Sequence, residues 1–395
     1  MNVWTDHLLR SLSSYPLVRY VTNLWRLIWT SPYSYSPLYF VMMQRLRGLK
    51  STILGQDTNK SHIAHELEEG SVPIDAEAAC RSCADPCDAG HDEYPSKFDV
   101  DMETRMLGSV KPYRRQVVIS TGKEDWAREV TDVKGTLAAY LGSVHTTKPS
   151  RGTHAGIGSP PKHVDGVFAA ENGGRLSVLN GSHATLSDDQ DQETVLIFPD
   201  YTLVTGVSAS EAAAQALYDA ALSPSALPGH LTGDMHTWVI PYSCVILLCS
   251  HKRRDNRCSI AAKTLEHCFC HALSSAGWQA DTRLEDPTAL MGSDPLEAFT
   301  GTAEEKEAHV KEQLKSLRTE KRALVLKNSH TGGHRYAGNC IIYTPAGQGV
   351  WYGRVTPHEV DMIVKTTLEG GKVLPSLLRG GVNIAKPGCH SLHEW

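Results

Sequence analysis

The sequence lacks any uncharged apolar run of about 18 or more residues, so we expect no transmembrane helix. It also lacks a Walker phosphate loop, a dinucleotide-binding glycine fingerprint after a strand, and a serine-hydrolase elbow. A formal net charge of −5 at pH 7 is not the positive charge typical of a nucleic-acid-binding protein, so we expect no nucleic-acid partner. These absences remove several large classes of enzyme and binding protein.

The chain has 395 residues and is 41% hydrophobic, which suggests two globular domains with extensions. Ten cysteines in 395 residues is a lower cysteine density than that of small secreted proteins held together by disulfides. Their clustering indicates metal or redox chemistry in a reducing compartment.

The N-terminal 50 residues are poor in acids: Asp6 stands alone against five arginines and Lys50. This segment is rich in Ser, Tyr and Leu, which is typical of a mitochondrial targeting segment or of a basic, partly disordered extension. The C-terminal pair Glu394-Trp395 instead resembles a signal by which cytosolic iron–sulfur clients are recognised by their assembly machinery. We therefore expect a mitochondrial location, with the cytoplasm as the alternative.

Two short segments far apart in the chain complete each other as a metal site. Each follows an apolar run that predicts a buried strand, and Gly332-Gly333 allows a tight turn between two histidines. Two thiolates and two imidazoles at neighbouring strand ends suit a soft or borderline metal. The four predicted ligands, here called the central site, are Cys249, Cys258, His330 and His334.

The sequence around these ligands resembles the sucrase/ferredoxin-like family, the thioredoxin-like ferredoxins of fungi and plants. The resemblance covers roughly residues 75–381 and is carried by residues 330–339, 351–355 and 379–380. Some members bind a [2Fe-2S] cluster through two Cys and two His with the same Cys-x8-Cys and His-x3-His spacing. The resemblance thus implies a [2Fe-2S] cluster on the central site and an electron-transfer or oxidoreductase role. The family's sucrase label finds no support, because no motif places a pair of carboxylates.

The resemblance also implies partners: an electron donor or acceptor protein, for which a flavin reductase is one candidate, and iron–sulfur assembly machinery. Replacing two thiolates with neutral imidazoles makes a cluster less negative and raises its potential, as in Rieske centres. Between the two cysteines lies a basic collar that could dock an acidic electron donor, or could be a solvated loop. The collar residues are His251, Lys252, Arg253, Arg254 and Arg257.

The two halves of the chain repeat each other. Residues 175–183 align with 322–330, and residues 116–121 with 245–250. Each half is predicted to run strand, helix, strand, two strands and a final helix, which is the thioredoxin-like order with helices on a mixed sheet. In the first half, serine or glutamate replaces three ligands and one histidine remains, so we expect no cluster there. The four equivalents are Ser120, Glu129, His183 and Ser187.

We therefore expect an α/β protein of two tandem thioredoxin-like ferredoxin domains, the first degenerate. The predicted divisions are an N-terminal extension (1–75, unstructured from 51), a degenerate domain with a Cys-rich start (76–228), a [2Fe-2S] domain (229–381) and a tail (382–395). Residues 144–174 are predicted to be a long loop, and 303–321 and 261–273 to be helices.

A second group of donors precedes the first predicted strand. Zinc, redox-active thiols and purely structural cysteines are all compatible with it. Its residues are Cys80, Cys83, Cys87 and His91. Two function classes besides electron transfer stay open: a zinc-stabilised interaction protein, since Cys2His2 also suits zinc, and a thiol–disulfide oxidoreductase.

Overall fold

The computed structural model describes residues 56–78, 80–144, 162–292 and 294–394. The chain divides into two compact units, residues 1–59 and 60–395, and the β-sheet belongs to the second. The predicted targeting segment and Trp395 lie outside the described residues. Among the helices that the structure describes, none combines the length and apolar character needed to cross a membrane.

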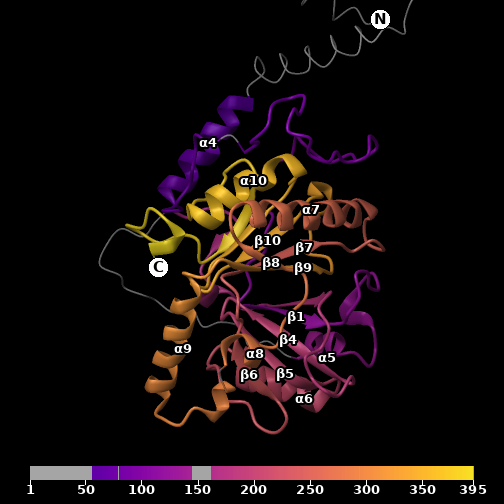
Figure 1. The fold of residues 1–395 in the computed structure, drawn as a ribbon, viewed down its shortest axis with the longest axis vertical. Helices are drawn as coiled ribbons and strands as arrows, with labels where there is room; N and C mark the ends of the chain where they lie inside the picture. Colours follow the sequence, from indigo (N-terminus) through magenta and orange to yellow (C-terminus); the bar gives the residue numbers. More distant parts are fainter. Residues whose placement is uncertain (1–55, 79, 145–161, 293, 395) are drawn as a thin grey trace, which may run out of the picture. The chain divides into compact units, whose positions relative to one another are not determined.

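The described strands form one mixed sheet with helices on its faces (Figure 1). The strands are β1 Arg115–Ser120, β2 Val167–Phe168, β3 Leu176–Gly181, β4 Gln192–Phe198, β5 Thr202–Ser208, β6 His236–Val239, β7 Cys244–Cys249, β8 Gln279–Asp281, β9 Arg322–Asn328, β10 Cys340–Tyr343, β11 Gly349–Tyr352 and β12 Leu378–Val382. The α-helices are α4 Gln56–Glu69, α5 Leu137–Ser143, α6 Glu211–Leu217, α7 Asn256–Ser275, α8 Pro287–Met291, α9 Ala303–Leu317 and α10 Val360–Ile363.

The two halves of the sheet have the same strand order. The first half runs β3-β1-β4-β5-β6 and the second runs β9-β7-β10-β11-β12. In each half the first pair is parallel and the later neighbours are antiparallel. The register also repeats, because Ser120 lies opposite Gly181 as Cys249 lies opposite Asn328. The internal repeat predicted from the sequence is therefore present in the topology.

The halves join edge to edge where β3 meets β9. The Ser182 N–H donates to the Lys327 carbonyl at 2.9 Å, and the Ser329 N–H donates to the Asn180 carbonyl at 2.8 Å. In return each serine hydroxyl accepts a backbone N–H from the opposite strand, at 3.0 Å in both cases. These matched bonds relate the two halves by an approximate twofold axis.

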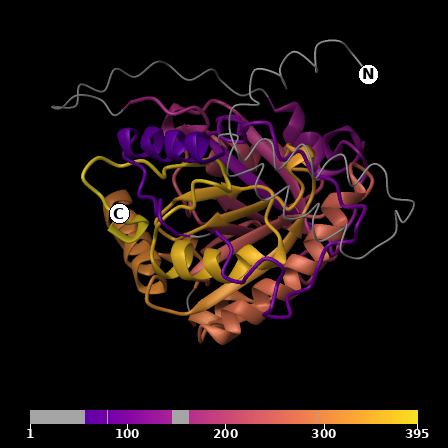
Figure 2. The same cartoon turned by 90° about the horizontal axis from the view of Figure 1, so that it is seen from above.

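Three large cores separate four layers. The apolar side chains of the first half that face α5 and α6 form one core, and those of the second half that face α7 and α10 form another. The third core lies between the opposite faces of the two halves. There Phe198 of β4 stacks on Tyr343 of β10, with ring centroids 4.0 Å apart. Seen from above, α7 and α10 lie side by side over the strands of the second half (Figure 2).

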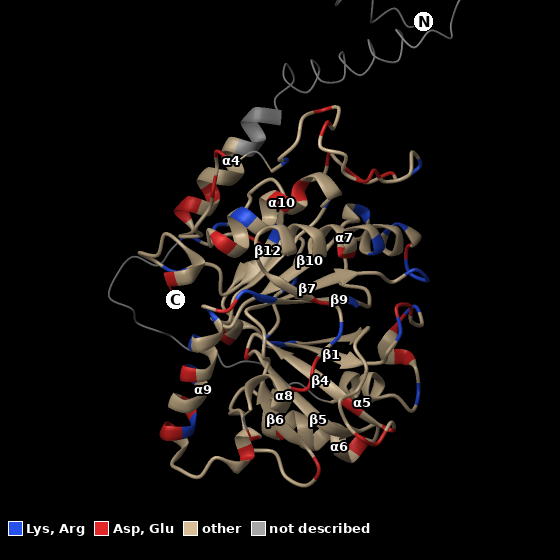
Figure 3. Cartoon of the chain, viewed as in Figure 1, with Lys and Arg blue, Asp and Glu red and all other residues tan. Residues whose placement is uncertain are grey.

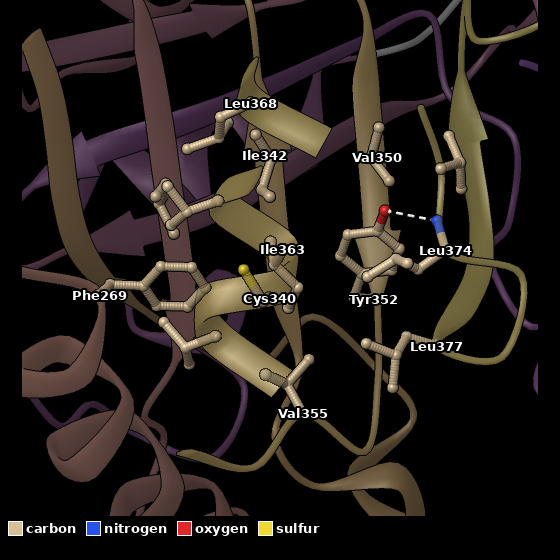
Figure 4. Packing of buried hydrophobic residues seen from close by; sticks show 14 of the residues in the cluster. Phe269, Cys340, Ile342, Val350, Tyr352, Val355, Ile363, Leu368, Leu374 and Leu377 are labelled. Atoms are coloured by element: carbon tan, nitrogen blue, oxygen red, sulfur yellow. Dashed lines mark hydrogen bonds between the residues drawn. The ribbon is translucent and has the colours of Figure 1, made fainter. Parts of the chain in front are cut away.

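Buried hydrogen bonds in the core under α10 hold the elements of the second half together. The Tyr352 hydroxyl accepts the backbone N–H of Leu374 at 3.0 Å and bonds the Thr367 hydroxyl at 2.7 Å, which ties β11 to the segment before β12 (Figure 4). Phe269 of α7 and Cys340 of β10 are fully buried in the same core.

Most of the predicted helices are present, and one segment differs. The charged helix α9 carries both signs on its surface and is capped by Thr302 and Glu305 (Figure 3). The expectation that residues 51–75 have no regular structure is wrong for α4. Leu67 of α4 is fully buried, and Glu66 pairs with Arg105 at 2.6 Å, so tertiary contacts stabilise a segment whose composition is polar.

Candidate functional site

The central site lies where β7 and β9 end. Cys249 is the last residue of β7, and Cys258 lies in the first turn of α7, whose N-cap is Asp255. His330 follows β9, and His334 opens a short 3₁₀ helix. Since β7 and β9 are parallel neighbours, their carboxyl ends meet at one edge of the sheet.

The structure brings three predicted ligands close together and places the fourth beside them. Cys258, His330 and the backbone N–H of Thr331 lie near enough to the Cys249 thiol to lower its pKa. The rings of His330 and His334 have centroids 5.4 Å apart. Both cysteines are buried, whereas His334 is exposed. The site therefore has an inner thiol pair and an outer histidine pair.

The two thiols titrate as a pair. The pKa of Cys249 lies well below its usual value, mainly because of the hydrogen bond with Cys258. His330 lowers this pKa further, whereas burial raises it. The same hydrogen bond and burial raise the pKa of Cys258. Of the two thiols, Cys249 therefore loses its proton more readily, and the thiolate is the form that binds metals.

His330 has a buried nitrogen without a partner. Its Nδ1 makes no hydrogen bond within the described residues, although buried polar atoms are nearly always bonded. His251, which lies close by, is different: its Nε2 bonds the Trp126 carbonyl at 2.9 Å, and its Nδ1 accepts the His330 N–H at 3.2 Å. Both nitrogens of His251 are therefore engaged, and it orients the His330 backbone instead of offering a ligand.

Arg379 supplies a buried positive charge beside the thiols. Its side chain is 1% exposed, and within the described residues no carboxylate forms an ion pair with it. It donates to the Asn339 side-chain oxygen at 2.7 Å and to the Gly332 carbonyl at 3.1 Å. Burial lowers the pKa of Arg379 to about 10, partly offset by the charge of Cys249. The guanidinium can therefore neutralise negative charge at the central site.

The arginines of the basic collar are engaged within the chain. Arg254 pairs with Glu129, and Arg253 pairs with Asp125 at 3.4 Å, so both reach the first half. Arg257 pairs with Asp255 at 2.7 Å. The collar thus links the two halves, and its side chains are only partly free to meet another protein.

A cavity of about 710 Å³ opens beside the histidine loop. Its walls come from both halves and include Arg254, Glu129 and the 330–333 loop. The outer, histidine side of the central site therefore faces a space large enough for a small molecule or a protein side chain.

The first-half equivalents of the ligands make other contacts. Ser120 donates to Glu193 at 2.6 Å, and Ser187 accepts the Gly206 N–H at 2.9 Å. His183 is buried; its Nε2 bonds the Thr194 carbonyl at 3.2 Å, and its Nδ1 has no partner within the described residues. No cysteine stands at any of these equivalent positions.

A second set of donors comes together more tightly. Within the described residues, two groups have ligand atoms that all lie within 4.8 Å of one another, and the central site is not one of them. One is Asp92, His267 and Cys268. The other, here called the outer site, is Cys83, Cys87, His91 and His358, and it could hold a metal ion.

The sequence predicted three residues of the outer site and missed the fourth. His358 lies in the 3₁₀ helix Pro357–Glu359, more than 260 residues away in the chain. Thr356 and Glu359 form a capping box around this turn, but no spacing in the sequence links His358 to the cysteines. Cys80, which we expected in this group, packs instead against the core under α10.

The chain is similar to one family of known proteins. The family model described as sucrase/ferredoxin-like matches residues 106–380. Altered inheritance of mitochondria protein 32 of Meyerozyma guilliermondii is 30% identical over 139 residues, 35% of each chain. The protein of that name from Debaryomyces hansenii is 30% identical over 141 residues, 35% of this chain and 36% of its own.

In Clavispora lusitaniae, 52 residues of the same-named protein are 48% identical, covering 13% of this chain and 19% of that one. The matched segments thus span about a third or less of these relatives. The resemblance to the sucrase/ferredoxin-like family inferred from the sequence is confirmed. No solved structure matches the chain.

Proposed function

Because the chain belongs to the sucrase/ferredoxin-like family, we propose that it is a redox protein carrying one [2Fe-2S] cluster on the central site. The observation that carries the proposal is the proximity of Cys249, whose pKa is lowered, to Cys258 and His330 at the ends of the neighbouring strands β7 and β9. Two soft thiolates and two imidazoles are a known donor set for such clusters. A bound cluster would accept and release one electron at a time.

The surrounding residues support such a role. The buried charge of Arg379 offsets the negative charge of thiolates and cluster, and His251 holds the His330 backbone in place. His334 is exposed and can exchange a proton with solvent when the charge of the site changes. The cavity beside the histidine loop offers a partner access to this side.

We also propose that each half is a thioredoxin-like domain, divided near residue 228, and that the first half binds no cluster. The shared strand order supports this division. The contacts of Ser120 and Ser187 support the loss of the first-half site. The basic N-terminal segment and the names of the relatives favour a mitochondrial location.

The test is anaerobic purification followed by absorption and EPR spectroscopy with metal and sulfide analysis. We expect about two irons and two sulfides per chain. Zinc without iron would support a zinc-stabilised interaction protein and overturn the cluster. Iron bound without sulfide would also overturn it.

A further inference from the structure

The outer site joins a loop to a helix. Cys83, Cys87 and His91 lie in the irregular segment between α4 and β1, and His358 lies just before α10. The segment contains no helix or strand from residue 80 to 114, so it has few backbone hydrogen bonds within itself. A cross-link at this point would fix its course over the second half.

Each histidine of the outer site is oriented with one nitrogen toward a thiol. His91 Nδ1 lies 3.5 Å from Cys87 Sγ, and its Nε2 lies 3.2 Å from an oxygen of Asp361. His358 repeats this arrangement: its Nδ1 lies 3.2 Å from Cys83 Sγ.

The Nε2 of His358 lies 3.1 Å from an oxygen of Glu93. A carboxylate that accepts the Nε2 proton makes Nδ1 the acceptor nitrogen, which is the usual arrangement around a zinc-bound histidine. Arg81 Nη2, 3.4 Å from the His358 Nδ1, agrees with an acceptor at that atom. Both imidazoles thus present an acceptor nitrogen to the same point.

We propose that Cys83, Cys87, His91 and His358 bind one Zn²⁺ ion in a closed tetrahedral site that is separate from the central site. Four ligand atoms that all lie within 4.8 Å of one another suit a single ion. A binuclear cluster holds its ligands as two pairs on different metal ions, so ligands across it lie farther apart.

The charges of the outer site also favour zinc. Two thiolates neutralise Zn²⁺, and Arg81 donates to Cys83 Sγ at 3.3 Å, which a thiolate accepts better than a thiol. Since all four positions are taken by protein ligands, the ion has a structural role and no open position for substrate.

The zinc-held segment continues to the central site. Phe98 and Val100, a few residues beyond the outer site, pack against Cys249 and Cys258. Arg257 of α7 donates to the Asp99 carbonyl at 2.6 Å. Zinc therefore holds one end of a strap, residues 83–100, whose other end covers the thiols of the central site. The strap would shield a cluster at the central site from solvent, an effect that rests on the function proposed above.

The test is zinc analysis of the full chain, purified anaerobically with zinc supplied. We expect about one zinc per chain in the wild type. Cys83→Ser and His358→Gln should each lose it, whereas Cys80→Ser, on the same segment but outside the site, should keep it. Zinc that persists in both ligand variants, or a wild type without zinc, would overturn the proposal.

A variant outside the ligand set guards against misfolding. Asp361→Asn should retain all four ligands but weaken zinc about 10- to 100-fold in competition with a chelator. Equal affinity in Asp361→Asn and wild type would contradict the orientation of His91 inferred here. Chelation of the wild type should also speed tryptic cleavage after Lys97 several-fold, and an unchanged rate would rule out the strap.

Cys249→Ser separates this proposal from the function of the central site. It should lose iron and keep zinc. If the wild type held zinc but no iron, the cluster would fail while the zinc site stood. Loss of zinc in Cys249→Ser would show that the two sites are not separate.

Discussion

Arg379 and Asn339 meet beneath the histidine loop, where Nη1 of the arginine donates to Oδ1 of the asparagine at 2.7 Å. Asn339 in turn donates to the Gly333 carbonyl at 3.2 Å. The pair thus connects the loop of the two histidines to a buried positive charge. A single polar pair both shapes the central site and sets its electrostatic potential.

Replacing Arg379 should lower the potential of the cluster. In Arg379→Met the reduced, more negative state loses a nearby unit charge, and the expected fall is on the order of 100 mV at an effective dielectric constant of about 20. Redox titration followed by EPR measures it. Arg335→Met, which removes an exposed arginine stacked on the same Tyr336 ring, is the control. Equal shifts in both variants would contradict the role of Arg379.

Exchange of a histidine ligand should change the potential and leave a cluster in place. His334→Cys adds a thiolate and should lower the potential, whereas His334→Ala should leave the cluster labile. The exposed His65 provides a matched control in His65→Ala, which should behave as wild type. An unchanged reduced EPR spectrum in the alanine variants of both His330 and His334 would contradict the ligand assignment.

The sequence predicted the part of the site that depends on local signals. The apolar run before Cys249 and the glycines between the histidines are visible in the chain, and the structure places them at adjoining strand ends. It could not predict His358, because only tertiary packing brings that residue to Cys83. The sequence could not predict the pairing of Arg253 with Asp125 for the same reason, since Asp125 lies in the other half of the chain.

The fold shows the same division. The helices predicted at 261–273 and 303–321 lie in α7 and α9, and the repeat predicted the same order of elements along the chain in both halves. The core between the halves was not predictable, since a strand buried on both faces reads the same whatever covers it. The helix α4 was missed because its stability comes from the burial of Leu67 and the Glu66–Arg105 pair, which no local pattern reveals.

The shared core predicts that the two halves unfold together. Phe198→Ala removes the ring that stacks on Tyr343 across the core and should cost about 3–5 kcal/mol of unfolding free energy. Urea titrations followed by near- and far-ultraviolet circular dichroism should coincide in the wild type. Met102→Ala, at a side chain 60% exposed, should change stability by about 0.5 kcal/mol or less. Two separate transitions would show that the halves fold independently.

The buried His183 predicts a loss of stability in mild acid. Burial lowers its pKa to about 4, although the bond to the Thr194 carbonyl opposes this, and the unfolded chain protonates it near 6.5. Between these pH values the unfolded state binds more protons than the folded state. The free energy of unfolding therefore falls by roughly 3 kcal/mol in all as the pH drops from 6.5 to 4, and His183 has no such effect above pH 6.5.

Urea unfolding at several pH values measures the free energy of unfolding. His183→Gln should flatten the profile between pH 6.5 and 4, whereas His163→Gln, at a side chain 82% exposed, should retain the wild-type slope. Equal slopes for His183→Gln and wild type would show that His183 is not buried in its neutral form.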